Sequence, residues 1–145
     1  MNKDTPPHRF DHEKLAVYGK SLEFTAWVTG ILDQVPKALS VWDQLDRAST
    51  SMPLNIAEGT GKFTIRDKCR YYDSARGSAL ECAACLDVLV VKKVLTPEQI
   101  GSGKELLHPI VAMLVGLIRS VAPGRVYGDS RVGRPGRGVQ VKVKE

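Results

Sequence analysis

Residues 51–62 read SMPLNIAEGTGK, and this stretch decides between two different folds. A phosphate-binding loop of the Walker A type needs the pattern G-x-x-x-x-G-K-[ST], whose backbone amides surround a phosphate. Gly61 and Lys62 satisfy part of that pattern, but Ile56 stands where its first glycine should be. Phe63 follows the lysine in place of the required Ser or Thr. The stretch is therefore not a nucleotide-binding loop.

The same stretch fits the second half of a helix that begins near residues 40–43. Apolar residues recur there at steps of three or four, as on one face of a helix: Leu45, Ala48, Met52 and Ile56. Pro53 removes one backbone donor from this helix, because proline has no N–H. Gly59 and Gly61 are expected to end the helix in a flexible turn.

A ribbon of polar side chains runs beside this apolar face. We name it the polar ribbon, and its members are Gln44, Arg47, Ser51, Asn55 and Glu58. One interpretation is the solvated side of an amphipathic helix. The other is a polar network that organises the packing of helices or subunits, since the small neighbours Ala48 and Ser49 permit close approach. The sequence leaves both interpretations open.

Two more segments have helical periodicity on either side of this one. The first extends from about Asp11 to Val35 and carries the predicted core stripe Leu15, Tyr18, Leu22, Thr25, Thr29 and Leu32. The next follows Thr64, which resembles the start of a capping box with Asp67 in the place of Glu. Its predicted stripe is Tyr72, Ala75, Ala79, Cys82, Leu86 and Leu89.

The last helical segment begins after Thr96. Pro97 suits the first helical position, and Gln99 completes a capping box. Its predicted core stripe is Leu106, Ile110, Met113, Leu117 and Val121. Because short connections join all four segments, neighbouring helices should pack antiparallel.

The predicted fold is all-α, an antiparallel up-down four-helix bundle over residues 11–122. Residues 1–10 are expected to form a flexible N-terminus. Residues 123–145 form a basic tail rich in Gly, Pro and Arg, which cannot bury a core and is expected to be disordered.

The positive charge of the chain is unevenly distributed. Residues 1–122 carry 15 Lys and Arg against 14 Asp and Glu, whereas residues 123–145 carry six against two. Most of the net charge of +5 therefore lies in the tail. The polar N-terminus lacks the apolar region of a signal peptide, and no apolar run is long enough to cross a membrane. With three cysteines, an odd number, we expect a reducing, cytoplasmic location.

Two groups of basic residues are candidates for nucleic-acid binding. Lys62, Arg66, Lys68 and Arg70 surround the start of the third helix, where they could bind phosphates in a salt-dependent manner. The second group lies in the tail: Arg125, Arg131, Arg134 and Arg137. The first group could instead be a solvated face neutralised by nearby carboxylates, and the tail could be a solubilising extension.

Enzymatic chemistry is not expected. Cys82 and Cys85 form a C-x-x-C pair on the apolar side of the third helix, where core packing explains them better than zinc or redox chemistry. Neither a catalytic triad nor a pair of carboxylates can be recognised. We therefore predict no catalytic residue, no metal site and no cofactor.

Three blocks of sequence resemble a known family. The run from Gln44 to Lys62 reads Q-L-x-R-A-S-x-S-x-P-x-N-I-A-E-G-x-G-K, and the run from Arg70 to Glu81 reads R-Y-Y-x-x-A-R-G-S-A-L-E. A shorter block covers Leu15 to Glu23. Together they resemble the four-helix-bundle proteins encoded in intervening sequences of large-subunit ribosomal RNA genes. That family is related to the accessory variability determinants of diversity-generating retroelements.

The resemblance covers about residues 11–121 and implies a cytoplasmic bundle that assembles into a homo-pentamer. It also implies RNA or DNA and a reverse transcriptase as partners. We expect a non-enzymatic, oligomeric accessory or scaffold protein that binds nucleic acid or a nucleic-acid enzyme. The alternative is a structural, protein-binding oligomer without nucleic-acid affinity, which the near-neutral charge of residues 1–122 favours.

Overall fold

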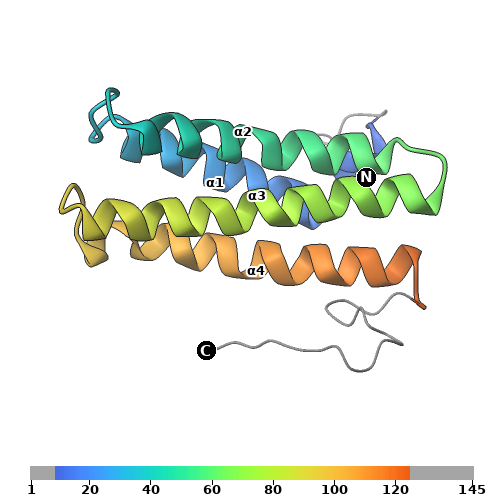
Figure 1. The fold of residues 1–145 in the computed structure, drawn as a ribbon. Coiled ribbons are helices and arrows are strands. Elements are labelled where there is room, and N and C mark those ends of the chain that lie inside the picture. The colour runs from blue at the N-terminus through green and yellow to red at the C-terminus, as the bar shows by residue number, and fades with distance from the viewer. Residues whose placement is uncertain (1–8, 125–145) are drawn as a thin grey trace, which may run out of the picture.

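The computed structural model describes residues 9–124, and residues 1–8 and 125–145 lie outside this range. Four long helices follow a short 3-10 turn, and no strand occurs between residues 9 and 124. Their bounds are Asp11–Lys14 for η1, Ala16–Leu32 for α1, Ser40–Thr60 for α2, Ile65–Val91 for α3 and Pro97–Val121 for α4. Figure 1 shows the helices side by side, with consecutive helices antiparallel.

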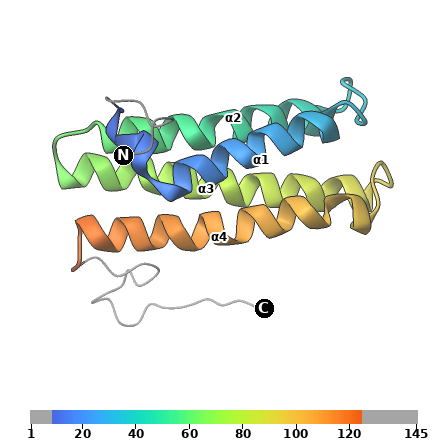
Figure 2. The same cartoon turned by 180° about the vertical axis from the view of Figure 1, so that it is seen from behind.

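Each helix packs against two neighbours. Helix α1 contacts α2 and α4, and α3 contacts the same two helices, so α1 and α3 lie diagonally across the bundle. The view from behind shows α1 between α2 and α4 (Figure 2). The most extensive contact joins α2 to α3. This arrangement is the predicted four-helix bundle.

The predicted core faces of α2 and α3 are confirmed. All four stripe residues of α2 and all six of α3 are buried. Charged and polar residues occupy most of the opposite side of α2 and of the first half of α3, whereas the second half of α3 also exposes Leu80, Val88 and Val91. Most of the buried stripe side chains pack with α1 and α4 into one large core, and Tyr72 packs with Cys69 and Ile118 in a smaller cluster.

The predicted faces of α1 and α4 are wrong in part. In α1 the buried residues are Val17, Ser21, Phe24, Val28, Ile31 and Leu32, whereas Leu22 and Thr29 are exposed. In α4 they are Ile100, Gly103, Leu107, Ile110, Leu114 and Ile118, and most of the predicted stripe is only half-buried. Both helices carry apolar residues on more than one side, so spacing alone does not select the face that is buried.

Helix α1 also begins later than predicted. Leu15 has an extended backbone, with φ of −87° and ψ of 129°, and separates η1 from α1. The capping box predicted at Thr96 is confirmed in full. The Thr96 hydroxyl accepts a hydrogen bond from the Gln99 N–H, and the Gln99 side chain accepts one from the Thr96 N–H. At Thr64 only the hydroxyl half of the capping box forms.

The backbone acceptor that Pro53 leaves without a helical donor is the carbonyl of Ser49. Thr25 of α1 supplies the replacement: its hydroxyl lies 3.2 Å from this carbonyl and 2.9 Å from the carbonyl of Ser21. Pro53 itself is buried in α2. A proline inside a buried helix is therefore accommodated by a side chain from the neighbouring helix.

Two glycines allow helices to approach closely. A Cβ atom on Gly59 would lie 2.9 Å from the Cβ of Tyr71, and one on Gly103 would lie 2.3 Å from the Trp27 ring. Gly59 is thus a packing position inside α2, and the expectation of a flexible turn there is wrong. The helix ends at Thr60, and Gly61 follows it in a right-handed conformation with φ of −83°.

Candidate nucleic-acid interface

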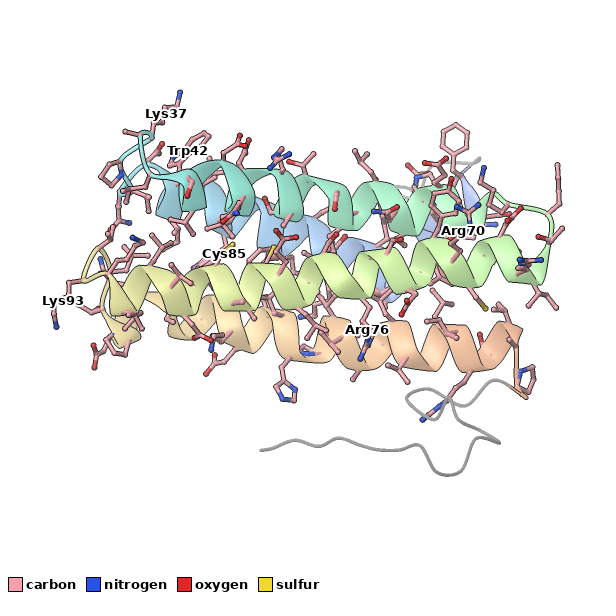
Figure 3. All side chains as sticks on the ribbon, viewed as in Figure 1. Lys37, Trp42, Arg70, Arg76, Cys85 and Lys93 are labelled. Carbon is pink, nitrogen blue, oxygen red and sulfur yellow. The ribbon has the colours of Figure 1, made fainter. Side chains whose placement is uncertain are left out.

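The α2–α3 end is the end of the bundle where residues 61–64 connect α2 to α3. Figure 3 shows Arg70 at this end and Lys37, Trp42 and Lys93 at the opposite end. The opposite end holds the connections over residues 33–39 and 92–96. We name five residues of the α2–α3 end the basic tip: Lys62, Phe63, Arg66, Arg70 and Tyr71.

Two cations of the basic tip lie against one aromatic ring. The Lys62 amine is 5.0 Å and the Arg70 guanidinium 4.9 Å from the centroid of the Tyr71 ring. Tyr71 is half-buried. Such cation–π contacts are worth about 0.5–1 kcal/mol each at exposed sites. The ring therefore holds two positive charges close together at the end of the bundle.

The same two cations also contact carboxylates. Lys62 Nζ lies 3.7 Å from Glu58 Oε2, and Arg70 Nη2 lies 3.2 Å from Asp67 Oδ1. The hydrogen bond from Arg70 lowers the pKa of the Asp67 carboxyl, and the same bond raises the pKa of Arg70. Asp67 is therefore ionised at neutral pH and offsets part of the charge of Arg70.

Arg66 is the exposed cation of the tip that folding does not use. It forms neither an ion pair nor a hydrogen bond with any residue between 9 and 124. At 100° per residue it shares the outward face of α3 with Arg70, as the sequence predicted, and both are exposed. The two arginines therefore present their charge to solvent one turn apart.

Lys68 has a structural role. Its amine donates to the carbonyl of Thr60 at 2.8 Å, and the side chain is partly buried. Thr60 is the last residue of α2, where carbonyls have no helical donor. Lys68 therefore caps α2, and this role accounts for its position. The four tail arginines of the second predicted group lie outside the described residues.

Phe63 is the member of the tip that sequence reasoning missed. Its side chain is 98% exposed, more than any other large apolar side chain between residues 9 and 124. It lies between Gly61, which ends α2, and Thr64, which caps α3. This position outside both helical stripes was the available signal, because an aromatic residue there has no core face to join.

Buried contacts fix the end of α2 beneath the tip. The hydroxyls of Tyr72 and Thr60 lie 3.0 Å apart in hydrogen-bond contact, and Tyr72 is buried as predicted. Burial raises the pKa of the Tyr72 hydroxyl, which therefore stays neutral. Together with the Lys68 cap, this contact holds the connection between α2 and α3 in one position.

The polar ribbon divides into a centre and two ends. At the centre, the Ser51 hydroxyl shares a hydrogen bond with Ser78 of α3, and Asn55 Nδ2 donates to the Ser51 carbonyl at 3.0 Å. Toward the ends, Arg47 pairs with Asp43, Glu58 pairs with Lys62, and Gln44 is exposed. The centre therefore joins α2 to α3, and the ends are a solvated helix face.

The cysteines belong to the core, as predicted. Cys69, Cys82 and Cys85 are buried, free thiols. Burial raises the pKa of Cys82 to about 12 and also raises that of Cys85, so both are protonated at neutral pH. Protonated thiols are poor nucleophiles and metal ligands. Between residues 9 and 124 no cluster of three or more potential ligands could hold a metal ion.

An apolar groove separates α3 from α4 on the outside of the bundle. Its volume is about 410 Å³, and its lining includes Ala79, Leu80, Ala83, Leu107, His108 and Val111. Lys104 of α4 lines it too and reaches Asp87 of α3 at 2.8 Å. Next to it, α3 exposes an uncharged stripe along one face: Gly77, Leu80, Ala84, Val88 and Val91.

Among the described helices, none is long and apolar enough to span a membrane.

Residues 13–116 match the 23S rRNA-intervening sequence protein family, and this range includes the basic tip and the groove. The chain belongs to this family. The predicted resemblance to proteins encoded in ribosomal RNA intervening sequences is thereby confirmed.

A solved member of the S23 ribosomal protein family, a protein of unknown function from Bacteroides thetaiotaomicron, has a similar fold. The two are 25% identical, with a TM-score of 0.67, over 72% of this chain and 99% of the other. No curated protein matches the chain.

Proposed function

We propose that this family member is a cytoplasmic, non-enzymatic accessory protein that binds nucleic acid through the basic tip. One observation supports the proposal above all others. Three cations and two aromatic rings gather at one end of the bundle, and two of these five residues, Phe63 and Arg66, have no role in the fold.

The carboxylates near the tip do not prevent such binding. Exposed ion pairs contribute only about 0–1 kcal/mol, so a phosphate can replace Glu58 beside Lys62 or Asp67 beside Arg70. Because residues 1–122 are nearly neutral overall, the local grouping of charge matters more than the net charge. The tail arginines would add further electrostatic contacts.

Charge reversal tests the tip in the full-length chain. Arg66→Glu combined with Arg70→Glu should weaken binding of labelled RNA and DNA and lower the salt slope by about two, one unit for each lost phosphate contact. Fluorescence anisotropy over a range of salt concentrations measures both effects. The matched control is Lys37→Glu combined with Lys92→Glu at the opposite end. This variant changes the net charge by the same amount, and it should bind nucleic acid more tightly than the tip variant does.

Two outcomes of this experiment would contradict the assignment. Equal losses in both double variants would show a general effect of net charge. An unchanged affinity in the tip variant, together with lost binding when all four tail arginines become serine, would place the site in the tail.

One contact offers a further check at the tip. Asp67→Asn removes the negative charge beside Arg70. It keeps the backbone N–H that donates a hydrogen bond to the Thr64 hydroxyl. We therefore expect this variant to bind nucleic acid more tightly than the natural chain.

A second candidate function is supported by the groove between α3 and α4. We propose that this face contacts other copies of the chain, as the homo-pentamer implied by the family resemblance requires. Exposed Leu80 and Val88 supply apolar surface there, and Gly77 and Ala84 permit close approach. On this reading the protein is a structural oligomer, and a nucleic-acid enzyme such as a reverse transcriptase is its protein partner.

Light scattering tests the self-association. Leu80→Lys with Val88→Lys should reduce the molar mass from that of five chains to that of one, and both sites are exposed in the single chain. A natural chain that is already monomeric at micromolar concentration would contradict this part of the proposal. Nucleic-acid binding through the tip would be unaffected by that result.

A further inference from the structure

We infer that the basic tip binds single-stranded nucleic acid, with Phe63 as the platform on which an unpaired base stacks. This inference rests on the proposed function and adds the class of nucleic acid. It follows from the exposure of one ring, the fixed backbone that carries it and the cations that flank it in the sequence.

The backbone that carries Phe63 is held on both sides. The Gly61 N–H donates to the carbonyls of Ala57 and Glu58 at 3.2 Å, and the Lys62 N–H donates to the Gly59 carbonyl at 3.2 Å. On the other side, the Thr64 hydroxyl accepts from the Asp67 N–H at 3.1 Å. The ring therefore projects from a fixed connection, so little order has to be gained when a ligand binds.

Folding offers no reason for an aromatic residue at this place. Burying a phenylalanine side chain contributes roughly 1.5–3 kcal/mol, and Phe63 forgoes this contribution at 98% exposure. Neighbouring Ile65 is also more than half exposed. An aromatic ring kept in solvent beside an apolar side chain suits a ligand with a flat apolar face.

The charges around the ring favour a nucleic acid over a protein. Lysine is depleted at the centres of protein–protein interfaces, whereas Lys62 directly precedes Phe63, and Arg66 follows three residues later. A nucleotide combines an anionic phosphate with a flat base, which matches cations placed on either side of an aromatic residue. The basic tip therefore offers cations for the phosphate and an aromatic ring for the base.

Of the two aromatic rings in the tip, Phe63 is the one that can stack. Tyr71 is half-buried, and the charged groups of Lys62 and Arg70 already lie about 5 Å from its ring centroid. Its contacts position the two cations. Bases within a duplex are stacked on one another, so only an unpaired base can lie on the ring of Phe63.

The test compares Phe63→Ala with the natural full-length chain on three probes. These are a labelled 20-nucleotide RNA of mixed sequence without self-pairing, the DNA of the same sequence, and the matching DNA duplex. The variant should bind both single strands about tenfold to a hundredfold more weakly, in line with the usual contribution of base stacking. Its duplex affinity and its salt slope should not change, because no charge is lost.

Two further variants control the result. Phe63→Trp should keep the single-strand affinity, because tryptophan also provides a stacking surface. Leu54→Ala removes apolar surface from a side chain of α2 that is 61% exposed and lies outside the basic tip and the groove, and it should change neither affinity.

Each outcome bears on the inference separately from the proposed function. If Phe63→Ala weakened binding of single strand and duplex equally, or weakened neither, the inference would be overturned. The proposed function would still stand if charge reversal at Arg66 and Arg70 abolished binding. A fall in molar mass for Phe63→Ala would show that the ring contacts another copy of the chain, which also overturns the inference. A natural chain that binds none of the probes would refute the proposed function as well.

Discussion

The two ends of the bundle use the same kinds of residues for different purposes. At the opposite end, Trp42 Nε1 donates to the Leu32 carbonyl at 3.0 Å, and the Lys37 amine lies 5.1 Å from the Trp42 ring centroid. The side chain of Gln99 donates to that of Gln34 at 2.9 Å and links the first turn of α4 to the connection over residues 33–39. At the α2–α3 end, Phe63 and Arg66 make no comparable contact.

The backbone around Lys93 forms an ordered helix end at the opposite end of the bundle. Lys93 has φ of 63°, a conformation that usually favours glycine. Its N–H donates to the Val90 carbonyl and the Val94 N–H to the Leu89 carbonyl, both at 2.9 Å. This pair of bonds is the Schellman motif that ends many helices. At the opposite end the aromatic ring of Trp42 and the amine of Lys37 thus have contacts within the fold, whereas Phe63 and Arg66 at the α2–α3 end have no such contact with any residue between 9 and 124.

The largest change in the free energy of unfolding should come from a substitution at Gly103 in α4. Gly103→Ala places a Cβ 2.3 Å from the Trp27 ring, and overpacking of this kind costs about 1–3 kcal/mol. Thermal or urea unfolding measures the loss. Gly116→Ala is the control in the same helix, because nothing lies within 4 Å of its added Cβ. That variant should be stabilised by up to about 1 kcal/mol through helix propensity.

A smaller loss should follow at Trp42. Trp42→Phe keeps an aromatic ring but removes the N–H that donates to Leu32, so the free energy of unfolding should fall by about 1 kcal/mol. Urea unfolding monitored by far-UV circular dichroism measures it. A change near zero would mean that the ordering of this end does not depend on the indole hydrogen bond.

A substitution at Lys93 should raise the free energy of unfolding instead of lowering it. Lys93→Gly relieves a left-handed conformation that costs most residues about 1–2 kcal/mol. Part of that gain is offset because glycine adds about 0.4–1 kcal/mol of disorder to the unfolded chain. We expect net stabilisation of about 0.5 kcal/mol or slightly more, seen as a higher melting temperature. A lower melting temperature would contradict the structural role given to this residue.

The smallest effect on stability should come from Phe63. Phe63→Ala removes a side chain that contacts little of the fold, so the free energy of unfolding should change by less than about 0.5 kcal/mol. Chemical denaturation of the monomeric form measures this. A loss as large as that of Trp42→Phe would erase the difference between the two ends and remove the reason to assign Phe63 to a ligand.

The sequence predicted the bundle and the buried faces of α2 and α3, most clearly in α2 and in the first half of α3, where charged residues mark the outer side. It predicted the buried faces of α1 and α4 only in part, since apolar residues such as Leu22 and Met113 occupy several sides of those helices. Only packing against neighbours selects which of them is buried. Periodicity is therefore most informative where polarity alternates strongly.

The candidate site shows the same division. Composition and position indicated the basic character of the tip, and the structure places Arg66 and Arg70 on the outward face of α3. The capping role of Lys68 could not be predicted, because it depends on how closely the end of α2 approaches α3. The position of Phe63 outside both helical stripes could have indicated its exposure, but its full extent depends on the path of the connection between the two helices.

The hydrogen bond from Thr25 to the Ser49 carbonyl determines how α1 can be aligned along α2. Ser21, Thr25 and Thr29 stand four residues apart in α1, so hydroxyl side chains recur about once per helical turn. A shift of α1 by half a turn would therefore leave the Ser49 carbonyl without a donor, because Pro53 has no N–H to supply. The proline thus restricts the alignment of α1 along α2 to positions that bring a hydroxyl to this carbonyl.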